Sequence, residues 1–143
     1  MMRHGRRIAF DYGDVRIGVA ISDLSGLLAT PHGVILTAED YLEEIARLVE
    51  EYEPIYFAVG QPRHLSGQPS EKMNSVEGFI AKLESRFNID IVRIDERLTT
   101  VSAARNLRAN GKNAKEAKSF IDAAAAATIL ESALAQEKSN PSP

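Results

Sequence analysis

The sequence contains no cysteine, no long apolar run and no overall excess of positive charge. Without cysteine there are no disulfides and no thiolate metal sites. No window approaches about 18 apolar residues, the length that a membrane-spanning helix needs. The apolar run that follows the basic N-terminus, Ile8–Phe10, is too short for a signal peptide, so we expect a cytoplasmic protein without a membrane partner. The net charge of −3 argues against a general nucleic-acid binder, and such a role would need a local basic patch.

The length of 143 residues suits a single domain that buries roughly 70% of the surface of its unfolded chain. We find no internal repeat and no linker. The sequence therefore predicts one domain over residues 1–138 and a disordered polar tail over residues 139–143.

Apolar runs and helical spacings alternate along the chain in an order that predicts the fold class. Three consecutive strands come first, and crossover units of helix and strand follow. This order predicts an α/β domain with a mixed sheet, antiparallel at one side and parallel at the other, with helices on both faces. The predicted elements are strands Ile8–Phe10, Val15–Ile21 and Val34–Leu36, a helix capped by Thr37 and ending at Tyr52, strand Ile55–Val59, a loop over 60–70, a helix over 70–87, strand Ile89–Ile94, and helices over 97–109 and 114–136.

Acidic residues follow the ends of two predicted strands, and another acidic residue lies within the last predicted helix. Asp11 follows the first strand, Asp95 and Glu96 follow the last strand, and Asp122 precedes an alanine run. Sites in open α/β sheets lie outside the carboxyl ends of the strands, so these acids converge if the first and last strands are neighbours. Converging carboxylates repel one another unless cations neutralise them, and such oxygen ligands suit Mg²⁺ or Mn²⁺.

Each acid also has an ordinary structural explanation. Asp11 can accept backbone hydrogen bonds in the turn that follows it. Asp95 and Glu96 can form a solvated strand end. Asp122 can pair with Lys118, four residues earlier on the helix surface. Only the combination of acids indicates a site, and the residues alone leave open whether Asp95 or Glu96 is the ligand.

A basic segment follows the acids at the end of the last strand. Between Arg97 and Lys118 there are six basic residues and one acid, Glu116, which gives a local charge of +5. The segment is either a phosphate-binding surface or a solvated pair of helix faces. Arg16 either contacts phosphate or pairs with Asp14. The candidate nucleic-acid-binding residues are Arg16, Arg97, Arg105, Arg108, Lys112, Lys115 and Lys118.

Four stretches match the motifs of one protein family, in the family's order and over nearly the whole chain. They are Ile8–Gly13 with Arg16–Ala20 and Ser22-Asp23, then Val59–Pro62 with Gly67, then Asp95–Thr100, and then Lys118 with Ile121–Ala126, Ile129 and Leu130. In these motifs the chain resembles the YqgF-type bacterial proteins, also called the RuvX or Holliday-junction-resolvase family, which have a ribonuclease H-like fold.

The resemblance implies a five-stranded ribonuclease H-like sheet and a metal-dependent nuclease. It places Asp11, Glu96 and Asp122 in the acidic positions, as catalytic residues and as ligands of Mg²⁺ or Mn²⁺. It implies maturation of the 5′ end of precursor small-subunit ribosomal RNA, or alternatively resolution of Holliday junctions. The expected partners are structured RNA, branched DNA and the precursor of the small ribosomal subunit. The chain is a monomer or a homodimer, and resolution of a symmetric junction would require a dimer.

Two other functions remain open at this point. An Asp-x-Gly turn before a hairpin is also similar to the first phosphate loop of sugar-kinase and actin-like ATPases. Those proteins enclose a nucleotide between two such domains, and this chain has room for one. The other alternative is a non-catalytic RNA-binding factor of ribosome assembly that keeps the fold without turnover.

Overall fold

The computed structural model describes residues 4–62, 71–96 and 114–139, with the backbone alone for 114–119. In this part of the chain the strands form one five-stranded sheet of order β3-β2-β1-β4-β5. β1 pairs antiparallel with β2, and β2 with β3, whereas β1–β4 and β4–β5 are parallel. The predicted mixed sheet is therefore confirmed. The elements in chain order are β1 (Arg7–Tyr12), β2 (Arg16–Ser22), β3 (Ala29–Leu36), α1 (Tyr41–Tyr52), β4 (Tyr56–Gln61), α2 (Glu71–Arg86), β5 (Asp90–Asp95) and α4 (Ala114–Ser139).

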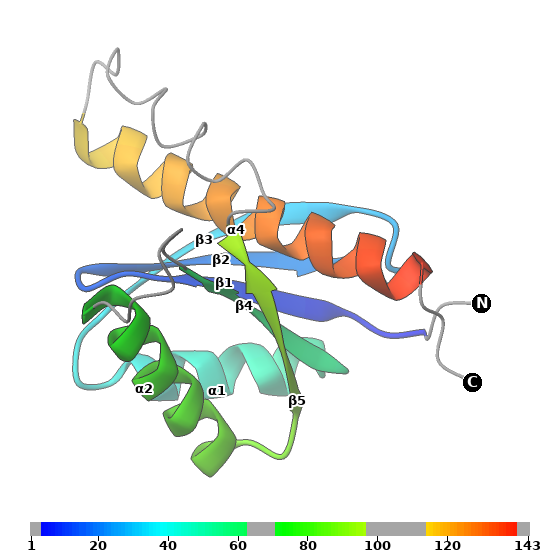
Figure 1. The fold of residues 1–143 in the computed structure, drawn as a ribbon, viewed down its shortest axis with the longest axis horizontal. Helices are drawn as coiled ribbons and strands as arrows, with labels where there is room; N and C mark the ends of the chain where they lie inside the picture. The colour runs from blue at the N-terminus through cyan, green and yellow to red at the C-terminus, as the bar shows by residue number, and fades with distance from the viewer. Residues whose placement is uncertain (1–3, 63–70, 97–113, 140–143) are drawn as a thin grey trace.

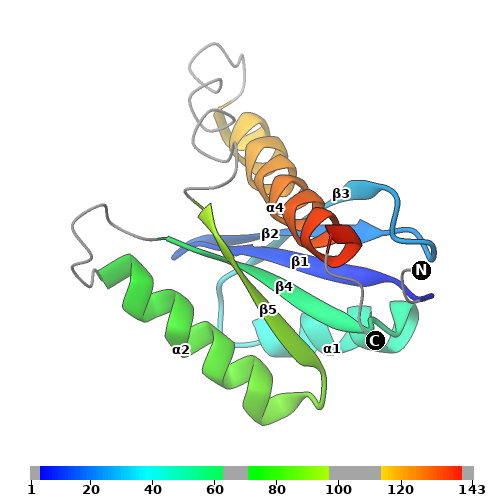
Figure 2. The same cartoon turned by 45° about the vertical axis from the view of Figure 1, so that its right-hand side comes forward.

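Different helices cover the two faces of the sheet, with α1 and α2 on one face and α4 on the other (Figures 1 and 2). Side chains alternate along a strand, so Ile8 and Phe10 join the core beneath α1 and α2, whereas Ala9 joins the core beneath α4. The α4 face is rich in alanine on both the sheet and the helix, which brings the helix close to the sheet. Its buried alanines are Ala9, Ala20, Ala58, Ala125, Ala126, Ala127 and Ala133.

The third strand and the first helix differ from the sequence prediction. β3 begins at Ala29 and continues past Pro31 and Gly33, because it is an edge strand whose pairing with β2 shifts register between Val19 and Ala20. The predicted cap by Thr37 is wrong. Its hydroxyl donates to the carbonyl of Gly13 (2.7 Å), and the helix begins four residues later, at Tyr41.

Element ends shift elsewhere by a few residues. Gly60 and Gln61 belong to β4 and not to the predicted loop, because they pair with the last two residues of β5. α4 continues to Ser139, beyond the predicted end at 136 and into the predicted tail. The predicted helix over 97–109, most of the predicted loop and residues 140–143 lie outside the described residues. Within the described ranges, no helix has both the length and the apolarity to cross a bilayer.

Candidate functional site

Asp11 lies in the central strand, one residue before its end, and only 3% of its surface is exposed. It shares a face with Ala9, so it points toward α4. Gly18 of β2 is its registered partner on one side. On the other side the register of β1 with β4 ends at Phe10 and Val59, so Gly60 follows beside Asp11. A carboxylate in the middle of the sheet is thus flanked by two residues without side chains.

The two glycines make room for the other predicted acids. A Cβ on Gly18 would stand 2.0 Å from the backbone carbonyl oxygen of Asp122. A Cβ on Gly60 would stand 2.8 Å from Oε1 of Glu96 and 2.5 Å from Cδ1 of Ile129. All three distances are below normal van der Waals contact, so any larger residue would displace α4 or the Glu96 carboxylate. The structure therefore brings Asp11, Glu96 and Asp122 to the α4 face, at the carboxyl ends of β1 and β5.

Strand alternation separates the neighbouring acids Asp95 and Glu96. Ile94 is buried beneath α4 with the second core cluster, so Asp95 faces the opposite side of the sheet. Glu96 follows the last residue of β5 and places Oε1 over Gly60. The geometry favours Glu96 over Asp95 as the acid that belongs with Asp11.

Asp122 is held by an ion pair with Arg16, in which Nε of Arg16 lies 3.0 Å from Oδ2 of Asp122. The two side chains are 21% and 22% exposed, so water reaches both. The sequence suggested Asp14 or a phosphate for Arg16. Its protein partner is Asp122, 106 residues away, and not Asp14, whereas the contact with phosphate stays a prediction. The side chain of Lys118, the local partner suggested for Asp122, lies outside the described side chains.

The donor set fits a hard divalent cation in its chemistry. Asp11, Glu96 and Asp122 offer carboxylate oxygens on one face, and Mg²⁺ and Mn²⁺ prefer such ligands. The set is not closed around an ion. Within the described residues, no three histidine, aspartate or glutamate side chains are grouped closely enough to hold one. The role of these acids as metal ligands stays a prediction.

Most of the predicted basic surface cannot be placed. Arg97, Arg105, Arg108 and Lys112 lie outside the described residues, and Lys115 and Lys118 are described by their backbone alone. Sequence reasoning also missed a cation at this end of the sheet. Lys72, near the start of α2, donates from Nζ to the carbonyl of Tyr12 at the end of β1. Its position just after a glycine- and proline-bounded loop was the available signal.

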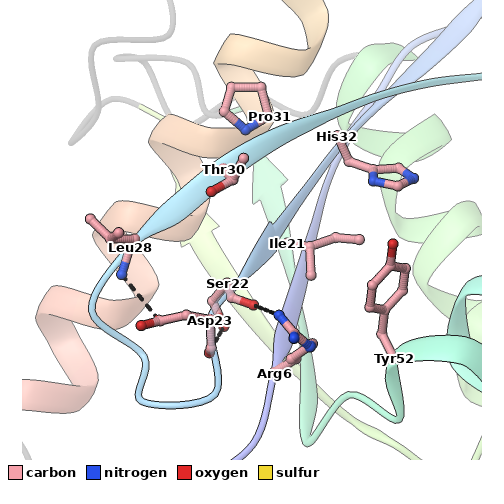
Figure 3. A pocket seen from close by; sticks show the side chains of 9 residues that line it. All are labelled: Arg6, Ile21, Ser22, Asp23, Leu28, Thr30, Pro31, His32 and Tyr52. Atoms are coloured by element: carbon pink, nitrogen blue, oxygen red, sulfur yellow. Dashed lines mark hydrogen bonds between the residues drawn. The ribbon is translucent and has the colours of Figure 1, made fainter.

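A hollow at the opposite end of β1 is not part of this site (Figure 3). Arg6 donates to the carbonyl of Ser22 at 3.2 Å, and Asp23 accepts from the amides of Leu27 and Leu28. The amide of Leu28, with that of Leu27, holds the pKa of Asp23 below its usual value. The carboxylate of Asp23 is thus held by backbone amides, as in an ordinary turn. The hollow is lined by Arg6, Ile21, Ser22, Asp23, Leu28, Thr30, Pro31, His32 and Tyr52.

Comparison with known sequences gives consistent matches over almost the whole chain. A family model described as "RuvX: Holliday junction resolvase" matches residues 5–136. A protein of Streptomyces avermitilis named "Putative pre-16S rRNA nuclease" is 44% identical over 140 residues, which cover 96% of this chain and 90% of that protein. A protein of the same name from Leifsonia xyli is 39% identical over 144 residues, covering 99% and 93%.

Comparison with solved structures gives the same fold at low sequence identity. The RuvC protein of T. thermophilus in complex with a Holliday junction substrate superposes with a TM-score of 0.53 at 17% identity, covering 94% of this chain and 96% of that one. The Fowlpox virus resolvase, in complex with Holliday junction DNA, gives 0.56 at 12% identity, covering 92% and 97%. These likenesses confirm the predicted ribonuclease H-like architecture.

Proposed function

Because this chain belongs to the RuvX family, we propose that it is a metal-dependent nuclease that matures the 5′ end of precursor 16S ribosomal RNA. The family resemblance expected from the sequence motifs is confirmed by the match over residues 5–136. The proposed substrate follows the names of relatives about 40% identical over most of the chain. The observation that carries the proposal is the placement of Asp11, Glu96 and Asp122 on the α4 face, around two bare glycines.

The three acids have different roles in the proposed site, which follow from how firmly each side chain is held. Asp11 is fixed in the central strand and buried, so it anchors the site. Glu96 follows β5 and approaches over Gly60. Asp122 reaches the site from α4, whose backbone packs on Gly18. Mg²⁺ or Mn²⁺ bound by these oxygens would supply an activated water and neutralise charge on the phosphate.

The surroundings of the site fit a long anionic substrate. The site lies at the carboxyl ends of β1 and β5, beside the N-terminal half of α4. The basic residues of the segment 97–118 follow Glu96 directly and would contact phosphates. We propose a cytoplasmic protein that acts on the precursor of the small ribosomal subunit, as a monomer or a homodimer.

A second substrate is supported by a different observation. The description of the family model names a Holliday junction resolvase, and both superposed structures are complexes with a Holliday junction. Branched DNA carries the same phosphodiester chemistry, and the three acids would serve either substrate. The alternative, a non-catalytic RNA-binding assembly factor, predicts binding without cleavage.

The test compares both substrates under one set of conditions. The purified chain is incubated with labelled precursor 16S ribosomal RNA and with a labelled four-way DNA junction, in Mg²⁺, in Mn²⁺ and in EDTA. We expect metal-dependent cleavage of the RNA at its 5′ end. Preferential cutting of the junction would favour the resolvase, and binding to the RNA without product in either metal would favour the assembly factor.

Asp11→Asn is the variant that tests the proposed site most directly. Replacing a carboxylate oxygen with an amide removes charge at the buried anchor, and we expect cleavage to fall at least about 100-fold with the fold retained. Asp14→Asn is the matched control, because Asp14 is exposed in the following turn. A folded Asp11→Asn protein that cuts at the rate of the unmodified chain would remove Asp11 from the site.

A further inference from the structure

The Arg16–Asp122 ion pair joins the start of β2 to α4 at the rim of the site. Arg16 shares the α4 face with Gly18, because the two are separated by one residue in the strand. The backbone of Asp122 packs on that glycine, and its carboxylate turns to Arg16. The positive charge that holds this acid in the structure is therefore a side chain of the protein itself.

The pair is made in a way that favours exchange. The contact at Asp122 uses Nε, and neither terminal nitrogen of Arg16 takes part in it. A guanidinium binds phosphate best through two nitrogens at once. Both partners are about one-fifth exposed, so water can replace either of them without a large desolvation cost. Arg16 is thus held by one hydrogen bond at a position where a phosphate could take two.

Arg16 and a divalent cation would compete for the same acid. A cation bound at Asp122 neutralises the carboxylate that holds Arg16, and the two positive charges repel one another. The released guanidinium of Arg16 remains beside the site. In a nuclease, the anion that it can bind there is a phosphate of the nucleic-acid strand.

We propose that Arg16 is a positioning residue that exchanges partners, holding Asp122 in the empty site and turning to a substrate phosphate when the cation binds. This inference rests on the proposed function, because it takes Asp122 as a ligand. It adds that binding of the cation and binding of the strand are positively coupled through one side chain. Coupling of this kind is reciprocal, so each ligand raises the affinity for the other by the same factor.

The first measurement is cation affinity in the absence of nucleic acid. Calorimetric titration with Mn²⁺ is made on the unmodified chain, Arg16→Gln and Arg16→Lys. Removing the competing charge raises Mn²⁺ affinity in Arg16→Gln by roughly three- to tenfold. Arg16→Lys keeps the charge, and its affinity stays near that of the unmodified chain. If Arg16 only fixed the orientation of Asp122, its loss would weaken Mn²⁺ binding, and weaker or unchanged binding in Arg16→Gln overturns the inference.

The second measurement is strand affinity with and without a cation. Fluorescence anisotropy follows a labelled precursor 16S fragment in EDTA and in Ca²⁺, which shares the preference for oxygen ligands. Gel analysis checks that the fragment stays intact. For the unmodified chain, Ca²⁺ raises affinity for the RNA. For Arg16→Gln, the gain from Ca²⁺ is reduced by roughly three- to tenfold. An equal gain in both proteins overturns the inference.

Arg93→Gln is the matched control for both measurements. Arg93 of β5 pairs with Glu77 of α2 at 3.2 Å and is 40% exposed, so the variant makes the same charge change away from the acids. We expect no change in either coupling or Mn²⁺ affinity. The outcomes separate this inference from the proposed function. A chain that cuts RNA but whose Arg16→Gln variant binds Mn²⁺ normally refutes the exchange alone, whereas a chain that neither binds Mn²⁺ nor cuts refutes both.

Discussion

Two arginine–carboxylate ion pairs join α4 to the sheet, one toward each end of the helix. One pair is buried and the other is partly exposed. Toward the C-terminal end, Arg7 contacts both carboxylate oxygens of Glu137, at 2.6 and 3.2 Å. The Arg7 side chain is completely buried, and the hydroxyl of Tyr56 donates to the same carboxylate at 3.0 Å. In the N-terminal half, Arg16 contacts Asp122 through one nitrogen, and both side chains reach solvent.

This difference indicates that one ion pair fixes α4 to the sheet, whereas the other belongs to the candidate site. A buried, doubly bonded pair is costly to break, because either partner alone would be left as an uncompensated charge. A partly exposed, singly bonded pair contributes little to stability and exchanges its partner readily. The C-terminal end of α4 is therefore the fixed end, and the end near Asp122 is the one at which a ligand can replace a protein contact. The following variants test this comparison, from the largest expected effect to the smallest.

Arg7→Met removes the buried ion pair between Arg7 and Glu137. It keeps apolar contact but leaves the Glu137 carboxylate without its arginine, and we expect the free energy of unfolding to fall by about 3–5 kcal/mol. Urea denaturation measures the change. The double variant Arg7→Met/Glu137→Met removes the stranded charge and should recover much of the loss. A single variant as stable as the unmodified chain would show that the two ends do not differ.

Gly18→Ala pushes α4 away from the sheet at the other end. Its Cβ would meet the backbone carbonyl of Asp122 at 2.0 Å, so the helix must shift, at a cost of about 2–3 kcal/mol. Cleavage should fall with stability, because Asp122 moves with the helix. Gly78→Ala on α2 is the matched control: nothing lies within 4 Å of its Cβ, so helix propensity should stabilise that variant by up to about 1 kcal/mol. Equal stability in the two variants would contradict the close approach.

Tyr56→Phe removes one hydrogen bond from the fixed end, and we expect a loss of about 1–2 kcal/mol near pH 8. Burial, reinforced by the Glu137 carboxylate, raises the pKa of the Tyr56 hydroxyl above its usual value of 10.0. Above about pH 10 the unfolded chain loses this proton while the folded chain keeps it, so the contribution of Tyr56 to stability falls as pH rises. Urea titrations at several pH values should show the deficit of the variant shrinking. Tyr52→Phe serves as control, and a deficit that grows above pH 10 would refute the assignment.

Arg16→Gln should have the smallest effect on stability. The pair it breaks is partly exposed and singly bonded, so the free energy of unfolding changes by less than about 1 kcal/mol. Thermal and urea unfolding beside Arg7→Met make the contrast direct. A loss as large as that of Arg7→Met would mean that Arg16 is a structural anchor and not an exchangeable partner.

The sequence alone was sufficient for the order of the five strands and of the three helices in the part of the chain that the structure describes. Apolar runs such as Tyr56–Val59 and the alanines after Asp122 are local signals, because periodicity and side-chain size act over a few residues. The family motifs also lie in short continuous stretches. Thr37 shows where local reasoning fails: its chemistry suits a helix cap, but a carbonyl 24 residues away takes its hydroxyl.

What only the tertiary structure decided is which charged groups meet. The sequence determined that Asp11, Glu96 and Asp122 are candidates, and left Asp95 beside Glu96 undecided. The alternation of β5 places the two acids on opposite faces of the sheet, with Glu96 over Gly60 on the face of α4. The partners of the two arginines lie 106 and 130 residues away. Attraction between charges depends on distance in space and on exposure to water, and neither is a property of neighbouring residues in the chain.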